Sequence, residues 1–269
     1  MKDFLNLLSI ASGSSGNSIY VGDGQTHLLI DAGISGKRIE QGLATIGLTP
    51  AQLDAVFVTH EHADHIAGLG VLARKYGIPI YATGGTIEGI LETKSVGKIE
   101  ESLFCPIRQD EMICVGSLRI DPLPVSHDAR EPVAYRIYGE EKRLGIITDL
   151  GCYTEEIVAG LQNMDALFVE ANHDENMRQV GPYPYPLKQR ILGQKGHLSN
   201  ESSGRLLGKV LSDRLKYIVL GHLSKENNMP ELAYEAVRLE INMSDNEFCA
   251  EDFTVMVAKR NEPMELLVI

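Results

Sequence analysis

Three histidines and an aspartate lie within six residues of this chain, at His60, His62, Asp64 and His65. Imidazole nitrogens and carboxylate oxygens are the ligands that borderline divalent metals such as Zn²⁺, Mn²⁺ or Fe²⁺ accept in proteins. A polar surface turn that is rich in histidine by chance is the alternative interpretation. However, the whole chain has only eight histidines, and three of them lie here. The segment 59–65 therefore predicts a metal site.

The sequence around this segment predicts how its side chains are presented. An apolar run precedes it, and the apolar spacing of residues 66–72 indicates a helix after it. The segment therefore connects the end of a buried strand to the start of a helix. In an extended chain, residues two apart point the same way, so His60 and His62 face one side. Asp64 and His65 fall in the following turn and can point to a second position.

Other hydrophobic runs also end on residues that can bind metals. Two of them end at Asp149 and at His222, a third ends just before His173, and a strand-like stretch is followed by His127. Open α/β sheets place ligands at the carboxyl ends of their strands. No linker or low-complexity tract divides the chain, so we expect a single α/β domain.

The metal segment resembles the HxHxDH signature of the metallo-β-lactamase superfamily. In that superfamily a His, a bridging Asp and a last His follow, and this chain has His127, Asp149 and His222 in that order. The resemblance implies a four-layer αβ/βα sandwich, in which two mixed β-sheets are flanked by helices, over residues 1–269. It also implies two divalent metal ions, Zn²⁺, Mn²⁺ or Fe²⁺. One would be bound by His60, His62 and His127, the other by Asp64, His65 and His222, with Asp149 bridging both.

The carboxylates in this pattern have distinct expected roles. A pair of metals ~3.5–4 Å apart holds a hydroxide between them and clamps the attacking and leaving oxygens. Asp149, as an anionic bridge, lowers the repulsion between the cations, and Asp64 and Asp149 are assigned to catalysis as well as to metal binding. Asp31 resembles the superfamily's first acidic position, where a carboxylate can hold a ligand His by its other ring nitrogen. Capping a helix is the alternative role of Asp31, and the sequence leaves both open.

Further motifs narrow the resemblance to one branch of the superfamily. Ser-Gly-Ser-Ser-Gly-Asn at 12–17, Val-Ser-His-Asp at 125–128, Gly-His-Leu-Ser-Asn at 196–200 and Gly-His-Leu-Ser at 221–224 are similar to the bacterial YycJ (WalJ) family. The similarity covers essentially the whole chain. That family is associated with DNA exonuclease activity, so the resemblance implies a 5′–3′ DNA exonuclease. The chain has no room for an inserted β-CASP domain and no tRNA-binding arm, which argues against activity of the RNase J or tRNase Z type.

The stretch 176–200 has no Asp or Glu, although the protein has a net charge of −12 from 25 basic and 37 acidic residues. It carries basic groups for phosphates and aromatic faces for bases, as a nucleic-acid groove does. Because the overall field is acidic, a polyanion has to be bound by such a local patch or by the metals. A solvated loop stiffened by proline is the alternative. The residues assigned to substrate binding are Arg178, Tyr183, Lys188 and Arg190.

His197 lies near the end of this stretch, and Ser199 and Asn200 can cap the helix that follows. A phosphate near a helix start meets free backbone N–H groups. His197 is therefore placed to donate a proton to a leaving oxygen or to hold a phosphate oxygen. For His173, a substrate contact and a structural hydrogen bond are both open.

The composition indicates the compartment. The four cysteines are scattered, which fits a reducing cytoplasm better than a disulfide scaffold. No apolar run approaches the ~20 residues that a membrane-spanning helix needs. We therefore expect a cytoplasmic protein without a membrane partner.

Together these patterns predict a dinuclear metal hydrolase that cleaves phosphodiester bonds, with DNA as the substrate and His197 assisting the leaving group. The main alternative is a small-molecule hydrolase, acting on a cyclic phosphodiester or on a thioester as in glyoxalase II-type enzymes, which would not need the basic stretch. A further alternative is an iron-dependent redox protein that uses the same ligands, although the sequence shows no flavin-binding domain.

Overall fold

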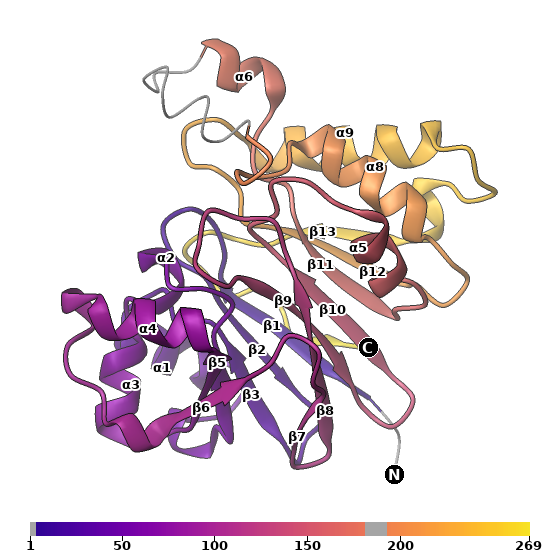
Figure 1. Cartoon of the computed structure of the whole chain (residues 1–269). Coiled ribbons are helices and arrows are strands. Elements are labelled where there is room, and N and C mark those ends of the chain that lie inside the picture. The colour runs from indigo at the N-terminus through magenta and orange to yellow at the C-terminus, as the bar shows by residue number, and fades with distance from the viewer. Residues whose placement is uncertain (1–3, 181–192) are drawn as a thin grey trace. The chain divides into compact units, whose positions relative to one another are not determined.

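The computed structural model describes residues 4–180 and 193–269 (Figure 1). Three residues that we expect to bind substrate, Tyr183, Lys188 and Arg190, lie outside the described residues. Within the described ranges, every helix is too short or too polar to cross a lipid bilayer.

The chain divides into two compact units. Unit 1 comprises Met1–Pro124, Ala129–Lys142 and Lys259–Ile269, and unit 2 comprises Val125–Asp128 and Arg143–Ala258. The metal segment 59–65 therefore belongs to unit 1, whereas His127, Asp149, His197 and His222 belong to unit 2. The expectation of a single domain without an inserted β-CASP domain stays a prediction.

A mixed sheet of seven strands forms the centre of unit 1. In sheet order the strands are β14 (Leu267–Val268), β1 (Asn6–Ala11), β2 (Ser18–Gly22), β3 (His27–Ile30), β4 (Ala55–Phe57), β5 (Ile80–Thr83) and β6 (Phe104–Ile107). Pairing is antiparallel from β14 to β3 and parallel from β3 to β6. Parallel neighbours need crossover connections, which are largely helical. The helices are α1 (Gly36–Ala44), α2 (Ala63–Ile66), α3 (Leu69–Tyr76) and α4 (Gly84–Glu92).

Local sequence signals explain where these helices begin and end. Ser35 caps α1, because its side chain accepts a hydrogen bond from the backbone N–H of Arg38. Thr83 caps α4 in the same way through Thr86. Helix α3 ends at Gly77, whose φ of 65° is the left-handed conformation that glycine adopts without a Cβ penalty.

The core of unit 1 lies between the parallel strands and the helices that connect them. Leu29, Val56 and Ile80 occupy one row across β3, β4 and β5 and belong to the same buried cluster as Leu43 of α1 and Leu72 of α3. Burying such a side chain contributes ~1.5–3 kcal/mol. This packing fixes the strands whose carboxyl ends carry Asp31 and the metal segment.

The second mixed sheet also has seven strands. In sheet order they are β13 (Thr254–Val257), β12 (Tyr217–Gly221), β11 (Ala166–Glu170), β10 (Arg143–Ile147), β9 (Val133–Tyr138), β8 (Leu118–Pro124) and β7 (Ile113–Val115). Strands β7, β8 and β9 form an antiparallel meander in unit 1. In unit 2, β10 to β13 are parallel, with Ile147, Val169, Leu220 and Val257 in one row. The carboxyl ends of these strands therefore meet at one edge.

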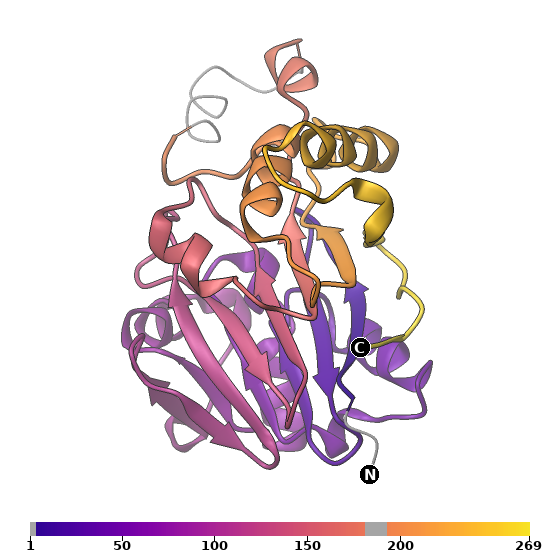
Figure 2. The same ribbon diagram turned by 90° about the vertical axis from the view of Figure 1, so that its right-hand side faces the viewer.

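Four helices accompany the parallel strands of unit 2 in the described ranges. They are α5 (Glu155–Gly160), α6 (Glu175–Val180), α8 (Asn200–Val210) and α9 (Pro230–Met243). Helices α8 and α9 lie side by side (Figures 1 and 2). They approach closely at Gly204, where a Cβ atom would lie 2.5 Å from Cβ of Glu240. Two mixed sheets with flanking helices confirm the predicted architecture.

Candidate metal site and catalytic group

Three of the predicted site residues follow strand ends in an unusual backbone conformation. Asp31 after β3, Asp149 after β10 and His222 after β12 have φ values of 60°, 59° and 53°. This left-handed conformation is uncommon outside glycine and costs of order 1–3 kcal/mol per residue. Such strain is retained where the surrounding structure holds the side chain in a required direction. Three strand ends that carry predicted site residues therefore share this backbone conformation.

The metal segment has the predicted strand–turn–helix form. It follows β4 and enters α2, with His62 at the cap position in extended backbone. The His60 ring lies 4.6 Å from that of His62 and 4.1 Å from that of His65, centroid to centroid. His65 Nε2 lies 3.6 Å from Asp64 Oδ2. Ligand atoms that share a tetrahedral cation at ~2.0–2.2 Å lie roughly 3.3–3.6 Å apart, so this pair has the spacing of two ligands of one ion.

Asp31 holds the metal segment from β3. Its Oδ2 accepts hydrogen bonds from His65 Nδ1 at 2.7 Å and from the Thr59 hydroxyl at 2.9 Å, and its Oδ1 accepts from the Thr59 N–H at 2.8 Å. The Thr59 hydroxyl oxygen in turn lies 3.0 Å from His60 Nδ1 and can accept a hydrogen bond from it. With the Nδ1 atoms of His60 and His65 carrying the protons, their Nε2 atoms keep the lone pairs that metal ligation requires.

Replacing Asp31 by Asn tests this support. The amide keeps the shape of the carboxylate but presents N–H groups to a ring nitrogen that must itself donate. We expect Asp31→Asn to weaken divalent metal binding by ~10–100-fold, the usual cost of losing a group that orients a ligand His. Competition with a chromogenic chelator measures this. Asp54→Asn is the matched control, because Asp54 caps the start of the same strand at the His27 N–H. Equal metal affinity in the two variants would assign Asp31 to folding alone.

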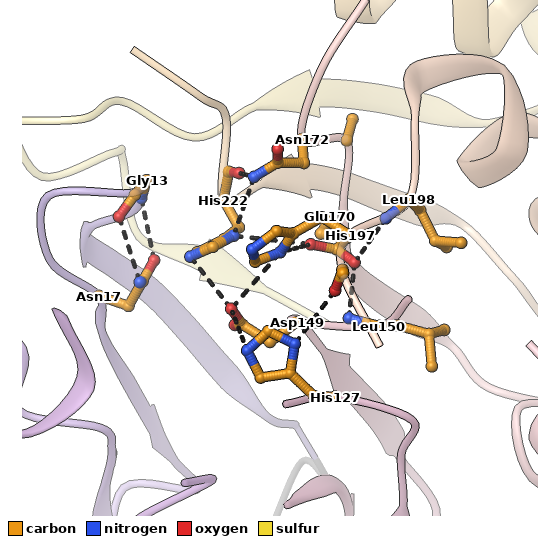
Figure 3. Close-up of polar contacts among 12 residues, drawn as sticks. Gly13, Asn17, His127, Asp149, Leu150, Glu170, Asn172, His197, Leu198 and His222 are labelled. Atoms are coloured by element: carbon orange, nitrogen blue, oxygen red, sulfur yellow. Dashed lines mark hydrogen bonds and ion pairs between the residues drawn. The ribbon is translucent and has the colours of Figure 1, made fainter. Parts of the chain in front are cut away.

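Asp149 lies between two imidazoles of unit 2 (Figure 3). Its Oδ1 is 3.4 Å from His222 Nε2 and 3.8 Å from His127 Nε2. These distances are long for a hydrogen bond but near the spacing of atoms that share a cation. The Nδ1–H group of His127 donates a hydrogen bond to the carbonyl of Gly196 at 3.0 Å, so Nε2 carries the lone pair of this ring. One carboxylate oxygen thus faces an imidazole nitrogen on either side.

Glu170 is a buried residue of this group that the sequence analysis did not single out. It ends β11 and is fully buried. Its Oε1 accepts from the backbone N–H groups of Leu150 at 2.6 Å and Leu198 at 3.0 Å. Its Oε2 lies 3.1 Å from His197 Nδ1 and 3.6 Å from His222 Nδ1 (Figure 3). The signal for it in the sequence was its place at the end of an apolar strand, which also applies to Asp149 and His222.

The charge state of Glu170 follows from these contacts. Burial by itself would raise the pKa of this carboxyl group, but the hydrogen bond from His197, the nearby His222 imidazole and the positive charges of both rings hold its pKa below the ordinary range. Glu170 is therefore a carboxylate at neutral pH. A fixed negative charge in a dry position stabilises positive charge on a neighbouring imidazole.

His197 is the more accessible imidazole of the unit 2 group. Its side chain is 20% exposed, compared with 1% for those of His127 and His222. Its Nδ1 is hydrogen-bonded to Glu170 Oε2 and lies 3.6 Å from Asp149 Oδ1. The ligand atoms of His127, Asp149 and His197 lie close enough together to hold an ion. With Nδ1 donating to the buried carboxylate of Glu170, Nε2 is the ring nitrogen that keeps a lone pair.

Hydrogen bonds and the close packing of Gly151 hold the loops that carry these residues together. The Gly151 N–H donates to the Ser126 carbonyl at 2.8 Å, and the Ser126 hydroxyl donates to the Gln194 carbonyl at 2.7 Å. A Cβ atom on Gly151 would lie only 2.3 Å from that Gln194 oxygen. These contacts therefore hold together the loops before His127, after Asp149 and before His197.

Comparison with known proteins identifies the family. Residues 26–219 match the family described as a beta-lactamase superfamily domain. The chain is 42% identical over 236 residues to the exodeoxyribonuclease WalJ of Streptococcus pneumoniae, and the match covers 88% of each chain. This chain belongs to the WalJ/YycJ family of metallo-β-lactamase-fold proteins. It is also 38% identical over 233 residues to the exodeoxyribonuclease YycJ of Bacillus anthracis, covering 87% of this chain and 88% of that protein.

A solved structure shows the same fold. The metallo-beta-lactamase fold protein YhfI from Bacillus subtilis superimposes with a TM-score of 0.69 at 20% identity, and the match covers 98% of this chain and 99% of that one. The predicted fold class is therefore confirmed. Membership of the WalJ/YycJ family, together with the clustered histidines and aspartates, supports binding of divalent metal.

The other residues assigned to substrate in this WalJ/YycJ family member lie around α6 and α8. Ser199 caps α8 as expected, and the Asn200 N–H donates to the carbonyl of His173. Burial, followed by the positive charge of Arg178, lowers the pKa of His173 to about 4, so this imidazole is neutral. Its Nδ1 has no hydrogen-bond partner within the described parts of the chain. Arg178, which we expect to bind substrate, belongs to α6 and is 5% exposed.

Proposed function

We propose that this protein is a metal-dependent nuclease that hydrolyses phosphodiester bonds in DNA, removing nucleotides from the 5′ end. The observation that supports this proposal most directly is the pair formed by Glu170 and His197. In this pair a buried carboxylate holds a partly exposed imidazole beside Asp149. The similarity to two exodeoxyribonucleases over 87–88% of the chain supports the choice of DNA.

We further propose that seven residues hold two divalent cations, Zn²⁺, Mn²⁺ or Fe²⁺. The assignment follows the residue order of the family, and the donor spacings and ring tautomers within each unit support it. When bound, such cations supply an activated water and stabilise negative charge on a phosphate. The proposed ligands are His60, His62, Asp64 and His65 of unit 1, and His127, Asp149 and His222 of unit 2.

Residues of unit 2 account for the proton that the leaving group needs. His197 holds one proton on Nδ1 through Glu170, so a second proton on Nε2 can be delivered to the departing 3′ oxygen. While the ring carries both protons, the Glu170 carboxylate offsets its charge. Two backbone N–H groups fix Glu170, and this keeps the ring from turning. The same network leaves His197 in place between turnovers.

Cleavage of end-labelled substrates tests this function. Single- and double-stranded DNA and RNA, labelled at either end, are incubated with protein stripped of metal and reloaded with each cation in turn. We expect mononucleotide release from 5′-labelled DNA that stops on chelation. Turnover of S-lactoylglutathione or of a cyclic phosphodiester without cleavage of DNA would favour the small-molecule hydrolase. Metal-dependent oxygen consumption would favour the redox protein.

Binding through the basic stretch stays a prediction that rests on its composition. Each Lys or Arg contact to a phosphate releases counterions, so affinity falls with salt at a log–log slope of about −0.9 per contact on duplex DNA. We expect Lys188→Ala with Arg190→Ala to flatten this slope by up to about two units and to leave hydrolysis of bis-p-nitrophenyl phosphate unchanged. The exposed pair Lys94 and Lys98 provides the charge-matched control. If replacing Lys94 and Lys98 by Ala flattened the salt slope equally, the basic stretch would have no special role in DNA binding.

We also propose a cytoplasmic location and a single-domain organisation. All four cysteines are free thiols in the structure, as expected in a reducing compartment.

A further inference from the structure

Glu61 lies between His60 and His62 in the metal segment, and its side chain bonds a distant part of unit 1. Its Oε1 accepts a hydrogen bond from the backbone N–H of Arg130 at 2.9 Å, across 69 residues of sequence. His62 has extended backbone, in which neighbouring side chains point to opposite sides of the chain. Fixing the side chain of Glu61 therefore also fixes the side on which His62 is presented.

Residues 130–135 donate hydrogen bonds along the start of the metal segment. Two of these go to backbone carbonyls, from the Tyr135 hydroxyl to Val58 at 2.8 Å and from the Val133 N–H to Thr59 at 3.1 Å. Any residue could supply those two acceptors, because every residue has a backbone carbonyl. The hydrogen bond from Arg130 is different, because it needs a side chain of suitable length and chemistry at position 61.

Helix α4 packs directly against Glu61. A Cβ atom on Gly89 would lie 2.4 Å from Glu61 Cγ, so the helix approaches this side chain at a position that has no side chain of its own. One turn earlier in the helix, the Gly85 N–H donates to Glu131 Oε2 at 2.8 Å. The side chain of Glu61 is therefore confined both by α4 and by the hydrogen bond from Arg130.

Asp31 and Glu61 hold different parts of the metal segment. Asp31 bonds Thr59 and His65, whereas Glu61 is anchored between two proposed ligands of one cation. We infer that Glu61 is a positioning residue, whose hydrogen bond to Arg130 sets the directions of His60 and His62. This inference rests on the proposed function, because it takes these two histidines as ligands of a divalent ion.

Two substitutions at position 61 separate the hydrogen bond from the charge. Glu61→Ala removes the acceptor, whereas Glu61→Gln keeps an oxygen for the Arg130 N–H. The amide nitrogen of Gln would take the place of Oε2, which is buried without a hydrogen-bond partner among the described residues, so no existing hydrogen bond is lost. We expect Glu61→Ala to weaken the binding of one divalent ion by ~10–100-fold, the usual cost of losing a group that orients a ligand, and Glu61→Gln to stay within ~3-fold of the wild type.

Titration of metal-stripped protein with Zn²⁺, in competition with a chromogenic chelator, measures the affinity of each ion without turnover. Glu131→Ala is the matched control, because it also removes a carboxylate that accepts a backbone N–H at α4 but lies outside the metal segment. It should bind Zn²⁺ as the wild type does.

A substitution in α4 tests the same contact from the helix. The Cβ atom of Gly89→Ala has to displace the side chain of Glu61, so we expect weaker binding of the same ion. Gly84→Ala is the control in this helix, because its Cβ atom would lie 3.8 Å from Glu131 Oε2, an ordinary contact. It should leave the affinity for Zn²⁺ unchanged.

Four results would overturn the inference. Wild-type affinity in both Glu61→Ala and Gly89→Ala would leave Glu61 as a packing residue, and equal losses in Glu61→Ala and Glu61→Gln would assign the effect to its charge. A loss of the same size in Glu131→Ala would assign it to the packing of α4. Loss of cooperative unfolding in both variants at position 61, followed by circular dichroism, would make Glu61 a folding residue. If the wild type bound divalent ions in this way but cleaved no DNA, the proposed activity would fail while this inference would stand.

Discussion

Replacing Asp149 by Ala is expected to remove more than one metal ion per chain and to lower the rate of DNA cleavage by more than ~10³-fold. Its Oδ1 faces Nε2 of both His127 and His222, so its loss removes a shared ligand rather than one of a set. Loss of one electrostatic stabiliser costs ~10²–10³-fold in rate, and loss of cations adds to this. Metal analysis after dialysis, with end-label assays on the same samples, measures both effects.

A matched acidic residue shows whether the effect belongs to the site. Asp213 is exposed in the same unit, and Asp213→Ala should keep metal content and rate at wild-type values. Full metal occupancy in Asp149→Ala would exclude Asp149 from the bridge. A loss of one ion only would assign it to a single metal, beside either His127 or His222.

Substitution of His197 by Ala is expected to keep the metals and to lower the rate by ~10²–10⁴-fold, the usual contribution of a general acid. Glu170→Gln should have a comparable effect. The side chain can still accept from Leu150 and Leu198, but it presents an amide where His197 Nδ1 needs an acceptor. Rates under single-turnover conditions and metal content by elemental analysis test both variants.

The combination of the two substitutions tests whether they act together. If Glu170 works by orienting His197, the double variant should be no slower than His197→Ala alone, because residues that act as a unit are not additive. Multiplied losses would mean that Glu170 has a role of its own, for example through His222. His27→Ala, which removes an imidazole hydrogen-bonded to Tyr20 in unit 1, should leave the rate unchanged. Loss of metal in His197→Ala would make it a ligand.

The family and the proposed metal ligands could be predicted because their signals are local or ordered along the chain. The cluster His60, His62, Asp64 and His65 needs only a strand that turns into a helix, and the apolar run before the cluster and the helical spacing after it indicate that form. His127, Asp149 and His222 follow strands, and parallel strands bring their carboxyl ends to one edge whatever the spacing between them in sequence. Residue types and strand ends are therefore sufficient to propose these positions as ligands.

The supporting residues depend on contacts that sequence spacing does not encode. Glu170 reaches Leu150 and His197 only because the register of β10, β11 and the loop before α8 brings together backbone N–H groups from distant segments. A carboxylate at a strand end could equally face solvent, so its charge and partners are decided by burial. The two open roles of Asp31 also differ only in three dimensions, where it bonds His65 while Ser35 caps α1.

Asn17 illustrates the same limit most clearly. In the sequence it is one polar residue of a glycine- and serine-rich loop, a composition that fits any turn. Only the folded chain places its amide 3.1 Å from His65 Nε2, across 48 residues of sequence. The sequence alone determined which residue types this protein has for metal chemistry and the strand ends on which they lie. The tertiary structure decided which ring nitrogen of His65 and of His127 faces a hydrogen-bond acceptor, because packing supplies that acceptor.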